Sequence, residues 1–411
     1  MVKYVYLTEF KGTDVGHQIL NGDIILFGDA DENTLKQALN CRRFFDHVAL
    51  MGDNHLGYSV PIGGVMTSRT HISPAAVGYD ICCGVTAYRL SVTEPEIAEE
   101  LPRIMETIWR SLSFGMGREN HETVDDPLFD SPIWSEPLGM RLRDLALNQL
   151  GTIGSGNHFV DVMADEENQI WVACHFGSRG LGHKIAEEFL ARAGAKEDNI
   201  NADPVLLELG TADAEEYIAW MELAGQYAYA GRRWVCNRAS EIVGGDIVMR
   251  VENHHNFASL EPLPDGSGSH WVMRKGATPA SPGKICFIGG SMGDDSVIVE
   301  GVQSEDSAAS FHSAPHGAGR AMSRNQARGK INRKTGKVIS KGLVSRQDMD
   351  EWLRNKGVIL RGGDTDEAPQ AYKRLEKVLA YHSNLKVLHR LRPLCVAMAG
   401  REISLRDPYK D

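Results

Sequence analysis

A cysteine, a carboxylate and three histidines of this sequence could together hold a metal. Asp80 and Cys83 stand three residues apart, close enough to reach one ion, and His158, His175 and His255 each lie at an end of a different strand-like run. A thiolate with imidazoles and one carboxylate suits zinc, manganese or iron(II) better than magnesium or calcium, which prefer oxygen ligands. Because one thiolate can bridge two ions, the pattern indicates a metal centre of one or two ions.

Each of these residues also has a structural interpretation. A single histidine beside a strand is more often a hydrogen-bonded structural residue than a ligand, and Cys82-Cys83 could be a small apolar pair in the core. Asp80 argues against a purely apolar core here, because a carboxylate in such a place needs a partner or a metal. The joint occurrence of the five residues therefore favours the metal centre.

Glycine-flanked polar clusters surround these candidates. They read GDNHLG at 52–57, VGYDICCG at 77–84, GSGNHF at 154–159, HFGSRGLGH at 175–183, ENHHNF at 252–257, GGSMG at 289–293 and HGAGR at 316–320. Most follow a strand-like run, which is where α/β proteins place ligand-binding loops. Backbone amides in GGSMG and HGAGR can cradle phosphate. Several strand ends could thus converge on one site for a phosphate-bearing ligand.

One segment is basic although the chain as a whole carries a formal net charge of −11. Residues 307–347 contain no Asp or Glu, and they contain Arg320, Arg324, Arg328, Lys330, Arg333, Lys334, Lys337, Lys341 and Arg346. Any nucleic-acid contact must therefore be a local patch on an acidic body. The 328–341 part also fits a solvated basic hairpin, so Arg320 and Arg324 are the stronger candidates for binding an anion.

Composition indicates a reducing compartment. The seven cysteines of this 411-residue chain are scattered and odd in number, unlike a disulfide framework, and no signal-peptide pattern precedes them. No apolar run approaches the roughly 20 residues that span a bilayer. We therefore expect a cytoplasmic protein with no membrane role.

Strand-like runs alternate with longer helical segments, and no repeat or Pro/Ser-rich linker divides them. The strand-like runs are 5–10, 23–27, 47–51, 85–92, 158–163, 170–175, 247–251, 284–288 and 296–300, and the helical segments are 93–113, 211–243 and 367–391. The polar stretch 115–137 reads as a loop. The pattern predicts one large mixed α/β domain over residues 1–411, with a central mixed sheet flanked by helices.

Six motifs occur in the order and spacing of one known family. They are VGYDICCGV, GSGNHF, HFGSRGLGH, HHNF, GGSMG and HGAGRAMSR. With these motifs the sequence resembles the RtcB family of RNA-splicing ligases from about residue 47 to residue 324, and more weakly near the C-terminus. Six ordered motifs make this resemblance far more specific than any one of them.

The resemblance implies two manganese ions and a guanine nucleotide. Asp80, Cys83, His158, His175 and His255 match the metal ligands, with Cys83 touching both ions, and zinc is a competing ion in the Irving–Williams order. His255 is preferred to His254, because the family ligand directly precedes an asparagine. His316 matches the histidine that becomes guanylylated. The positions that match nucleotide contacts are Asn157, His158, Phe159, Asp161, His255, Asn256, Gly289, Gly290, Ser291, Met292, Ser296, His316, Gly317, Ala318 and Gly319.

The family reaction joins broken RNA ends. An RNA 2′,3′-cyclic phosphate is opened to a 3′-phosphate, the guanylylated histidine passes GMP to that phosphate, and a 5′-hydroxyl end displaces GMP. The resemblance therefore implies GTP as cofactor and RNA, such as tRNA, as partner, with an activating protein as a further candidate partner. Arg179 and Arg320 are candidates for holding RNA or triphosphate oxygens.

Two departures from the family pattern bear on function. The tail LCVAMAGREISLRD lacks the family's C-terminal lysine, which touches the guanine nucleotide, and GDNHLGYSVPIGG lacks the lysine usually found after His-Leu-Gly. Two alternatives therefore stay open. One is a dinuclear-metal RNA-end phosphoesterase that has lost guanylylation, and the other is a non-catalytic RNA-binding protein that uses the basic segment.

Overall fold

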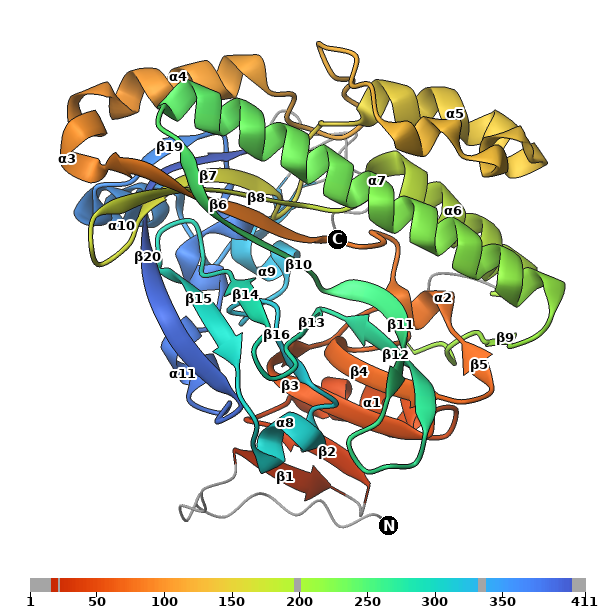
Figure 1. Cartoon of the computed structure of the whole chain (residues 1–411). Coiled ribbons are helices and arrows are strands. Elements are labelled where there is room, and N and C mark those ends of the chain that lie inside the picture. The colour runs from red at the N-terminus through yellow and green to blue at the C-terminus, as the bar shows by residue number, and fades with distance from the viewer. Residues whose placement is uncertain (1–15, 21–22, 196–200, 332–337, 401–411) are drawn as a thin grey trace.

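Two β-sheets carry the fold, and helices cover the larger one (Figure 1). The computed structural model describes residues 16–20, 23–195, 201–331 and 338–400. Among these, the larger sheet has the order β10 (Ile247–His254), β6 (Gly84–Thr93), β8 (Gln169–Phe176), β7 (Phe159–Ala164), β20 (Leu385–Met398), β15 (Ser296–Gly301) and β14 (Ile285–Ile288), with β19 (Ile359–Arg361) parallel to β20. Its other pairings are antiparallel.

The second sheet lies at the opposite end of the molecule from the helical layer (Figure 1). Its order is β1 (His17–Leu20), β2 (Ile24–Phe27), β3 (His47–His55), β4 (Ile62–Ser68), β12 (Ser269–Lys275) and β11 (Asn256–Pro262). Short pairs join β13 (Ala277–Pro279) to β16 (Ser313–Pro315), β17 (Gly329–Ile331) to β18 (Val338–Lys341) and β5 (His71–Ile72) to β9 (Leu207–Glu208). Because β11 directly follows β10, the two sheets meet at residue 255.

The long helix α7 (Ala212–Val243) crosses the larger sheet (Figure 1). The Thr211 side chain accepts from the Ala214 amide at its start, and Gly244, with φ 94°, ends it. The other helices are α1 (Glu32–Cys41), α2 (Pro74–Val77), α3 (Glu94–Ile97), α4 (Leu101–Ser111), α5 (Pro137–Gln149), α6 (Arg179–Arg192), α8 (Glu305–Ala309), α9 (Arg324–Arg328), α10 (Arg346–Lys356) and α11 (Leu375–Leu379). Trp220 and Tyr217 of α7 are fully buried, so α7 anchors a main hydrophobic cluster.

The mixed α/β class is confirmed, and so are most of the expected elements. The eight strand-like runs that fall on described residues overlap β2, β3, β6, β7, β8, β10, β14 and β15. The run 5–10 lies outside the described residues. The segment 211–243 is α7, and 93–113 is α3 and α4 joined by a 3₁₀ turn at Ala98–Glu100. The stretch 115–137 contains two further 3₁₀ turns, Pro127–Asp130 and Pro132–Ser135.

The helix expected over 367–391 is wrong. Only Leu375–Leu379 is α-helical, and Leu385–Met398 forms β20. This strand pairs with β15 on one side and with β7 on the other. Its position inside the sheet overrides the local helix propensity of the segment.

Two further predictions concern membranes and the number of domains. No helix of the described residues is both long enough and apolar enough to cross a bilayer. The prediction of one domain over residues 1–411 extends beyond the described residues and stays a prediction.

Candidate active site

The predicted metal ligands meet at one edge of the larger sheet. His255 directly follows β10, Cys83 directly precedes β6, His175 is the penultimate residue of β8, and His158 directly precedes β7. These four strands are neighbours and run alternately up and down, so the end of each lies beside the start of the next. Asp80 reaches the same edge from the turn between α2 and β6.

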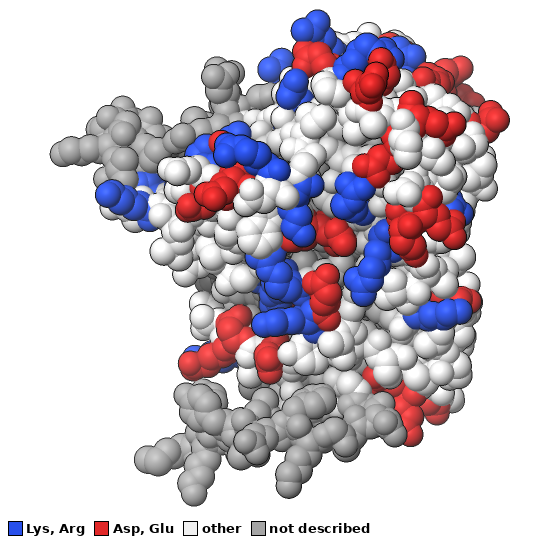
Figure 2. All heavy atoms as spheres, turned by 90° about the vertical axis from the view of Figure 1, so that its left-hand side faces the viewer, with Lys and Arg blue, Asp and Glu red and all other residues white. Residues whose placement is uncertain are grey.

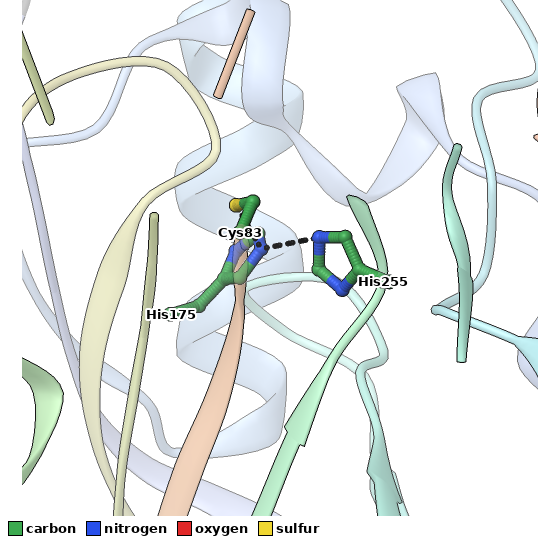
Figure 3. A group of neighbouring side chains, drawn as sticks. All are labelled: Cys83, His175 and His255. Carbon is green, nitrogen blue, oxygen red and sulfur yellow. Dashed lines mark hydrogen bonds between the residues drawn. The ribbon is translucent and has the colours of Figure 1, made fainter. Parts of the chain in front are cut away.

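The five side chains form two groups that share one sulfur. Cys83 Sγ lies 3.3 Å from His175 Nε2 and 3.6 Å from His158 Nε2. His175 Nε2 lies 3.3 Å from His255 Nε2, and Figure 3 shows these rings pointing toward each other below Cys83. His158 Nε2 lies 3.0 Å from Asp80 Oδ2. The first group consists of Cys83, His175 and His255, and the second of Asp80, Cys83 and His158. Within each group the possible ligand atoms lie within 4.8 Å of one another.

The hydrogen bonds behind two of these histidines suit metal ligation. His175 Nδ1 lies 3.1 Å from the Asn157 carbonyl oxygen, and His158 Nδ1 lies 3.0 Å from the Ile153 carbonyl oxygen. A carbonyl can only accept, so Nδ1 of His175 carries the proton and its Nε2 keeps a lone pair. The Nε2 atoms of both rings face Cys83 Sγ, and that of His158 also faces Asp80 Oδ2 at 3.0 Å. This arrangement of fixed imidazoles around a thiol fits a group that could hold metal.

Burial shifts the pKa values of the candidate metal ligands, and a bound cation would change their protonation. It lowers the pKa of His175 to about 3, so this imidazole is neutral, and it raises the pKa of Cys83 well above the ordinary thiol value. Burial alone would raise the pKa of Asp80, but the hydrogen bond from His158 and the charge of Arg179 outweigh burial and lower it. A cation would have to displace the proton of Cys83, so metal binding here would weaken in acid.

His316 lies next to this metal-binding group and is held by a carboxylate. Its ring centroid is 4.8 Å from that of His255, and its Nδ1 is 2.6 Å from Asp53 Oδ2. The same oxygen accepts from the backbone amides of His316 and Gly317, at 2.9 and 3.2 Å. Burial alone would lower the pKa of His316, but the charge of Asp53, the hydrogen bond to Asp53 and a hydrogen bond to the Gly276 backbone oxygen raise it.

Two glycine-rich loops lie side by side beyond His316. The Ala318 amide donates to the Gly289 carbonyl at 2.9 Å, and the Gly290 amide donates to Ser296 Oγ at 3.0 Å. A side chain at Gly319 would collide with the Asp53 backbone, since its Cβ would lie 2.2 Å from that oxygen. The close approach of the 316–320 loop to the backbone of β3 thus depends on glycine.

The remaining predicted nucleotide contacts have mixed surroundings. Phe159 lies 5.3 Å from the His175 ring, and Met292 belongs to the same small apolar cluster as Phe159. Asp161 is buried on β7, its Oδ1 has no hydrogen-bond partner, and burial raises its pKa well above the usual range. The Asn256 side chain bonds to backbone groups of the protein, donating to the Asp80 carbonyl and accepting from the Gly276 amide. Asp161 therefore has the stronger signature of a group that awaits a ligand.

The basic segment is largely neutralised where the structure describes it. Arg320 pairs with Glu367 at 3.2 Å, and Arg324 pairs with Glu367 and with Asp366. Arg328 lies 3.7 Å from Asp366. Figure 2 shows a face with basic and acidic side chains intermixed, not a continuous basic surface. Anion binding by these arginines would therefore compete with Asp366 and Glu367.

Comparison with known proteins decides the family. The family model described as tRNA-splicing ligase RtcB matches residues 34–133 and 135–399. The chain belongs to the RtcB family. It is 30% identical to a tRNA-splicing ligase RtcB of Nanoarchaeum equitans over 96% of this chain and 98% of the relative. It is 31% identical to an RNA-splicing ligase RtcB of Escherichia coli strain K12 over 86% of this chain and 90% of the relative.

This RtcB-family chain uses residues that its motifs alone did not single out. Asp53 stands inside the GDNHLG cluster, but nothing in the sequence pairs it with His316, 263 residues away. Arg232 of α7 is fully buried and donates to the backbone oxygens of Cys82 and Phe176, both at 2.8 Å. In the sequence, the only signal for Arg232 is its position among the many apolar residues of the segment 211–243.

The remaining sequence predictions concern His254, Arg179, Lys275 and the C-terminal tail. Among the described residues, the metal-binding groups include His255 and not His254, which instead packs 5.0 Å from the Phe257 ring. Arg179 lies 3.3 Å from His158 Nδ1, beside the metal-binding groups. Lys275 is buried and donates to the Tyr58 carbonyl at 2.8 Å. The altered tail beyond residue 400 lies outside the described residues.

Proposed function

We propose that this RtcB-family protein is a GTP- and manganese-dependent RNA ligase that joins a 2′,3′-cyclic phosphate or 3′-phosphate end to a 5′-hydroxyl end. The observation that carries the proposal is the position of His316. A carboxylate-held imidazole lies directly beside two overlapping metal-binding groups and two glycine-rich loops. A nucleophile, cation ligands and phosphate-binding loops in one place suit nucleotidyl transfer.

His316 Nε2 is the nucleophile in this proposal. Asp53 keeps the proton on Nδ1, so loss of the other ring proton leaves a lone pair on Nε2. Attack on the α-phosphorus of GTP forms a nitrogen–phosphorus bond and releases pyrophosphate. Water first opens a 2′,3′-cyclic phosphate by breaking its bond to the 2′-oxygen, which leaves a 3′-phosphate. The RNA 3′-phosphate then takes GMP from His316, and the 5′-hydroxyl oxygen loses its proton, attacks the activated phosphorus and releases GMP. The covalent relay divides one hard condensation into easier steps.

Asp80, Cys83, His158, His175 and His255 would hold two manganese ions, with Cys83 between them. Bound manganese would neutralise charge on the reacting phosphates and lower the pKa of the attacking oxygen. The chain's own contribution is to orient the two imidazoles of His175 and His158 through the Asn157 and Ile153 carbonyls. Zinc would compete for the same ligands.

The nucleotide would lie between the two glycine-rich loops and β7. Gly289 to Met292, Ser296 and Gly317 to Gly319 would contact the triphosphate and sugar, and Asn157 and Phe159 would flank them. Asp161 would accept hydrogen bonds from the N1 and N2 groups of guanine, because its Oδ1 is buried without a partner. Arg179 would hold an RNA phosphate beside the metal-binding groups.

RNA joining tests the proposal directly. The protein is mixed with manganese, GTP and two RNA strands, one ending in a 2′,3′-cyclic phosphate and one beginning with a 5′-hydroxyl. Joined product is expected from the wild-type protein and none from His316→Ala, while His71→Gln, remote from the metal-binding groups, keeps full activity. Conversion of the cyclic phosphate without joining would favour the phosphoesterase, and RNA binding without any conversion would favour a non-catalytic protein.

A further inference from the structure

A cavity of about 540 Å³ opens at the C-terminal end of α4, outside the metal-binding groups. It is lined by both aromatic and polar side chains, among them Trp109, Phe114, Arg118 and Asn120. Its volume falls in the roughly 300–1,000 Å³ range of sites that bind small molecules or parts of larger ones. No residue of this lining belongs to the predicted site.

The wall of this cavity is bonded to the loop that supports the metal ligands. The Ile153 amide donates to the Ser113 carbonyl at 2.9 Å, and the Gly115 amide donates to the Gly154 carbonyl at 2.7 Å. The Ile153 carbonyl, in turn, lies 3.0 Å from His158 Nδ1. One stretch of backbone thus connects the wall of the cavity to the carbonyl that supports His158.

The lining offers an aromatic ring and a cation with no protein partner. Trp109 is half-buried and stacks on the buried Phe114, with ring centroids 4.7 Å apart. Arg118 is exposed, and no other described residue bonds or pairs with it. Two other charged residues of the lining have partners, since Arg110 pairs with Glu106 and Glu119 accepts from Asn148. An aromatic ring beside an unpaired arginine suits one base and one phosphate of a single strand.

We propose that this cavity binds one nucleotide of the RNA strand whose end reacts in the metal centre, with the base against Trp109 and a backbone phosphate against Arg118. The inference rests on the proposed RNA ligase function. The cavity would affect only the binding of RNA. Guanylylation of His316 needs no RNA and does not involve this cavity.

The test measures RNA binding and guanylylation separately on the full chain. Single-stranded RNA with a terminal 2′,3′-cyclic phosphate carries 2-aminopurine at one of several positions, and a second series carries it in the 5′-hydroxyl strand. The variants are Trp109→Ala, Trp109→Phe and Arg118→Ala. The matched control is Arg103→Ala, an exposed arginine of α4 that pairs with Glu100 and does not line the cavity.

Trp109→Ala should weaken RNA binding by about 5- to 100-fold and abolish the quenching of 2-aminopurine at one position. Trp109→Phe should restore most of both. Arg118→Ala should weaken binding and lower the slope of log affinity against log salt by about 0.7. All three variants should label His316 with GTP at the wild-type rate in the absence of RNA, which also shows that they are folded.

Two results would overturn the inference. One is RNA affinity within about twofold of the Arg103→Ala control for both Trp109→Ala and Arg118→Ala. The other is an equal loss of affinity for free GMP, which would assign the cavity to a mononucleotide. A wild-type protein that binds RNA through Trp109 but is never guanylylated would refute the proposed ligase function and leave the cavity's role standing.

Discussion

Asp53 raises the pKa of His316 above that of a free imidazole, and in the proposed reaction with GTP this would set the pH dependence. Asp53 raises the pKa of His316, and the reactive form is the one that has lost the Nε2 proton. The rate of guanylylation should therefore rise with pH through the raised pKa and level off above it. The burial of both groups makes this coupling stronger than it would be in water.

Asp53→Asn should lower the pKa of His316 and move the rising part of the pH–rate profile to lower pH, by about 1–3 units. The amide oxygen can still accept from the His316 and Gly317 amides, so the loop should keep its place. Single-turnover labelling with GTP from pH 5 to pH 9 measures the shift. A profile that is unchanged in Asp53→Asn would show that Asp53 does not control the protonation of His316.

The choice of nucleotide is also a matter of single residues. In the proposed site the ionised carboxylate of Asp161 would accept from the N1 and N2 groups of guanine, and adenine lacks donors at those positions. Because the tail has no lysine where the family has one, we expect discrimination between GTP and ATP to be weaker by about 1–3 kcal/mol. Asp161→Ala should remove most of the remaining discrimination between GTP and ATP, whereas Glu167→Ala should leave it unchanged. Strict use of GTP by Asp161→Ala would assign base recognition to another residue, such as Arg401.

At the scale of elements, α7 ties together the strands that present the ligands. Arg232 donates to the carbonyls next to Cys83 and His175, one before β6 and one at the end of β8. These strands are neighbours, so one side chain fixes the separation of two metal ligands. Burying the charged guanidinium of Arg232 without a carboxylate partner costs free energy. This cost indicates that the hydrogen bonds of Arg232 serve the site.

Arg232→Met should leave two buried carbonyls without donors and lower the free energy of unfolding by about 1–3 kcal/mol for each. It should also weaken metal binding by roughly 10- to 100-fold, as losses behind a ligand do. The control is Arg233→Met, because that exposed arginine pairs with Glu252 at the surface and should cost at most about 1 kcal/mol. Denaturant unfolding and metal titration give both numbers. Wild-type metal affinity in Arg232→Met would refute the positioning role.

The elements also show where sequence patterns suffice. The strand-like runs predicted that His158, His175 and His255 lie near strand ends, and they do, because β-branched runs and glycine turns are local signals. The antiparallel order β10-β6-β8-β7, which brings those ends to one edge, is a long-range property and is not visible in any one run. The helix predicted over 367–391 wrongly includes residues 385–391 for the same reason: these residues belong to a strand that β15 and β7 flank. The pairing of Asp53 with His316 likewise depends on contacts between distant segments.

At the scale of the whole molecule, the residues that could hold metal lie at the ends of four strands of the larger sheet and at the entry to the second sheet. An ion that binds only the folded chain stabilises it by mass action, by about 3 kcal/mol when its concentration is 100 times Kd. Removing metal should therefore lower the melting temperature of the entire described fold and not only of a loop.

Cys83→Ala should lose most bound manganese or zinc and should melt at the same temperature with and without EDTA. The wild-type protein should melt lower with EDTA. Cys286→Ala removes a buried thiol of β14, outside the metal-binding groups, and should keep both the metal and the response to EDTA. Metal content is read by elemental mass spectrometry. Full metal content in Cys83→Ala would remove the shared thiolate from the proposed site.

The central claim is that His316 carries GMP, and peptide mapping after incubation with manganese and GTP tests it most directly. The peptide containing His316 should gain the mass of one GMP, and the adduct should be labile in acid and stable in base, as a phosphoramidate is. It should be absent from His316→Ala. A guanylylated peptide elsewhere in the chain, or no adduct in a protein that nevertheless joins RNA with GTP, would contradict the claim.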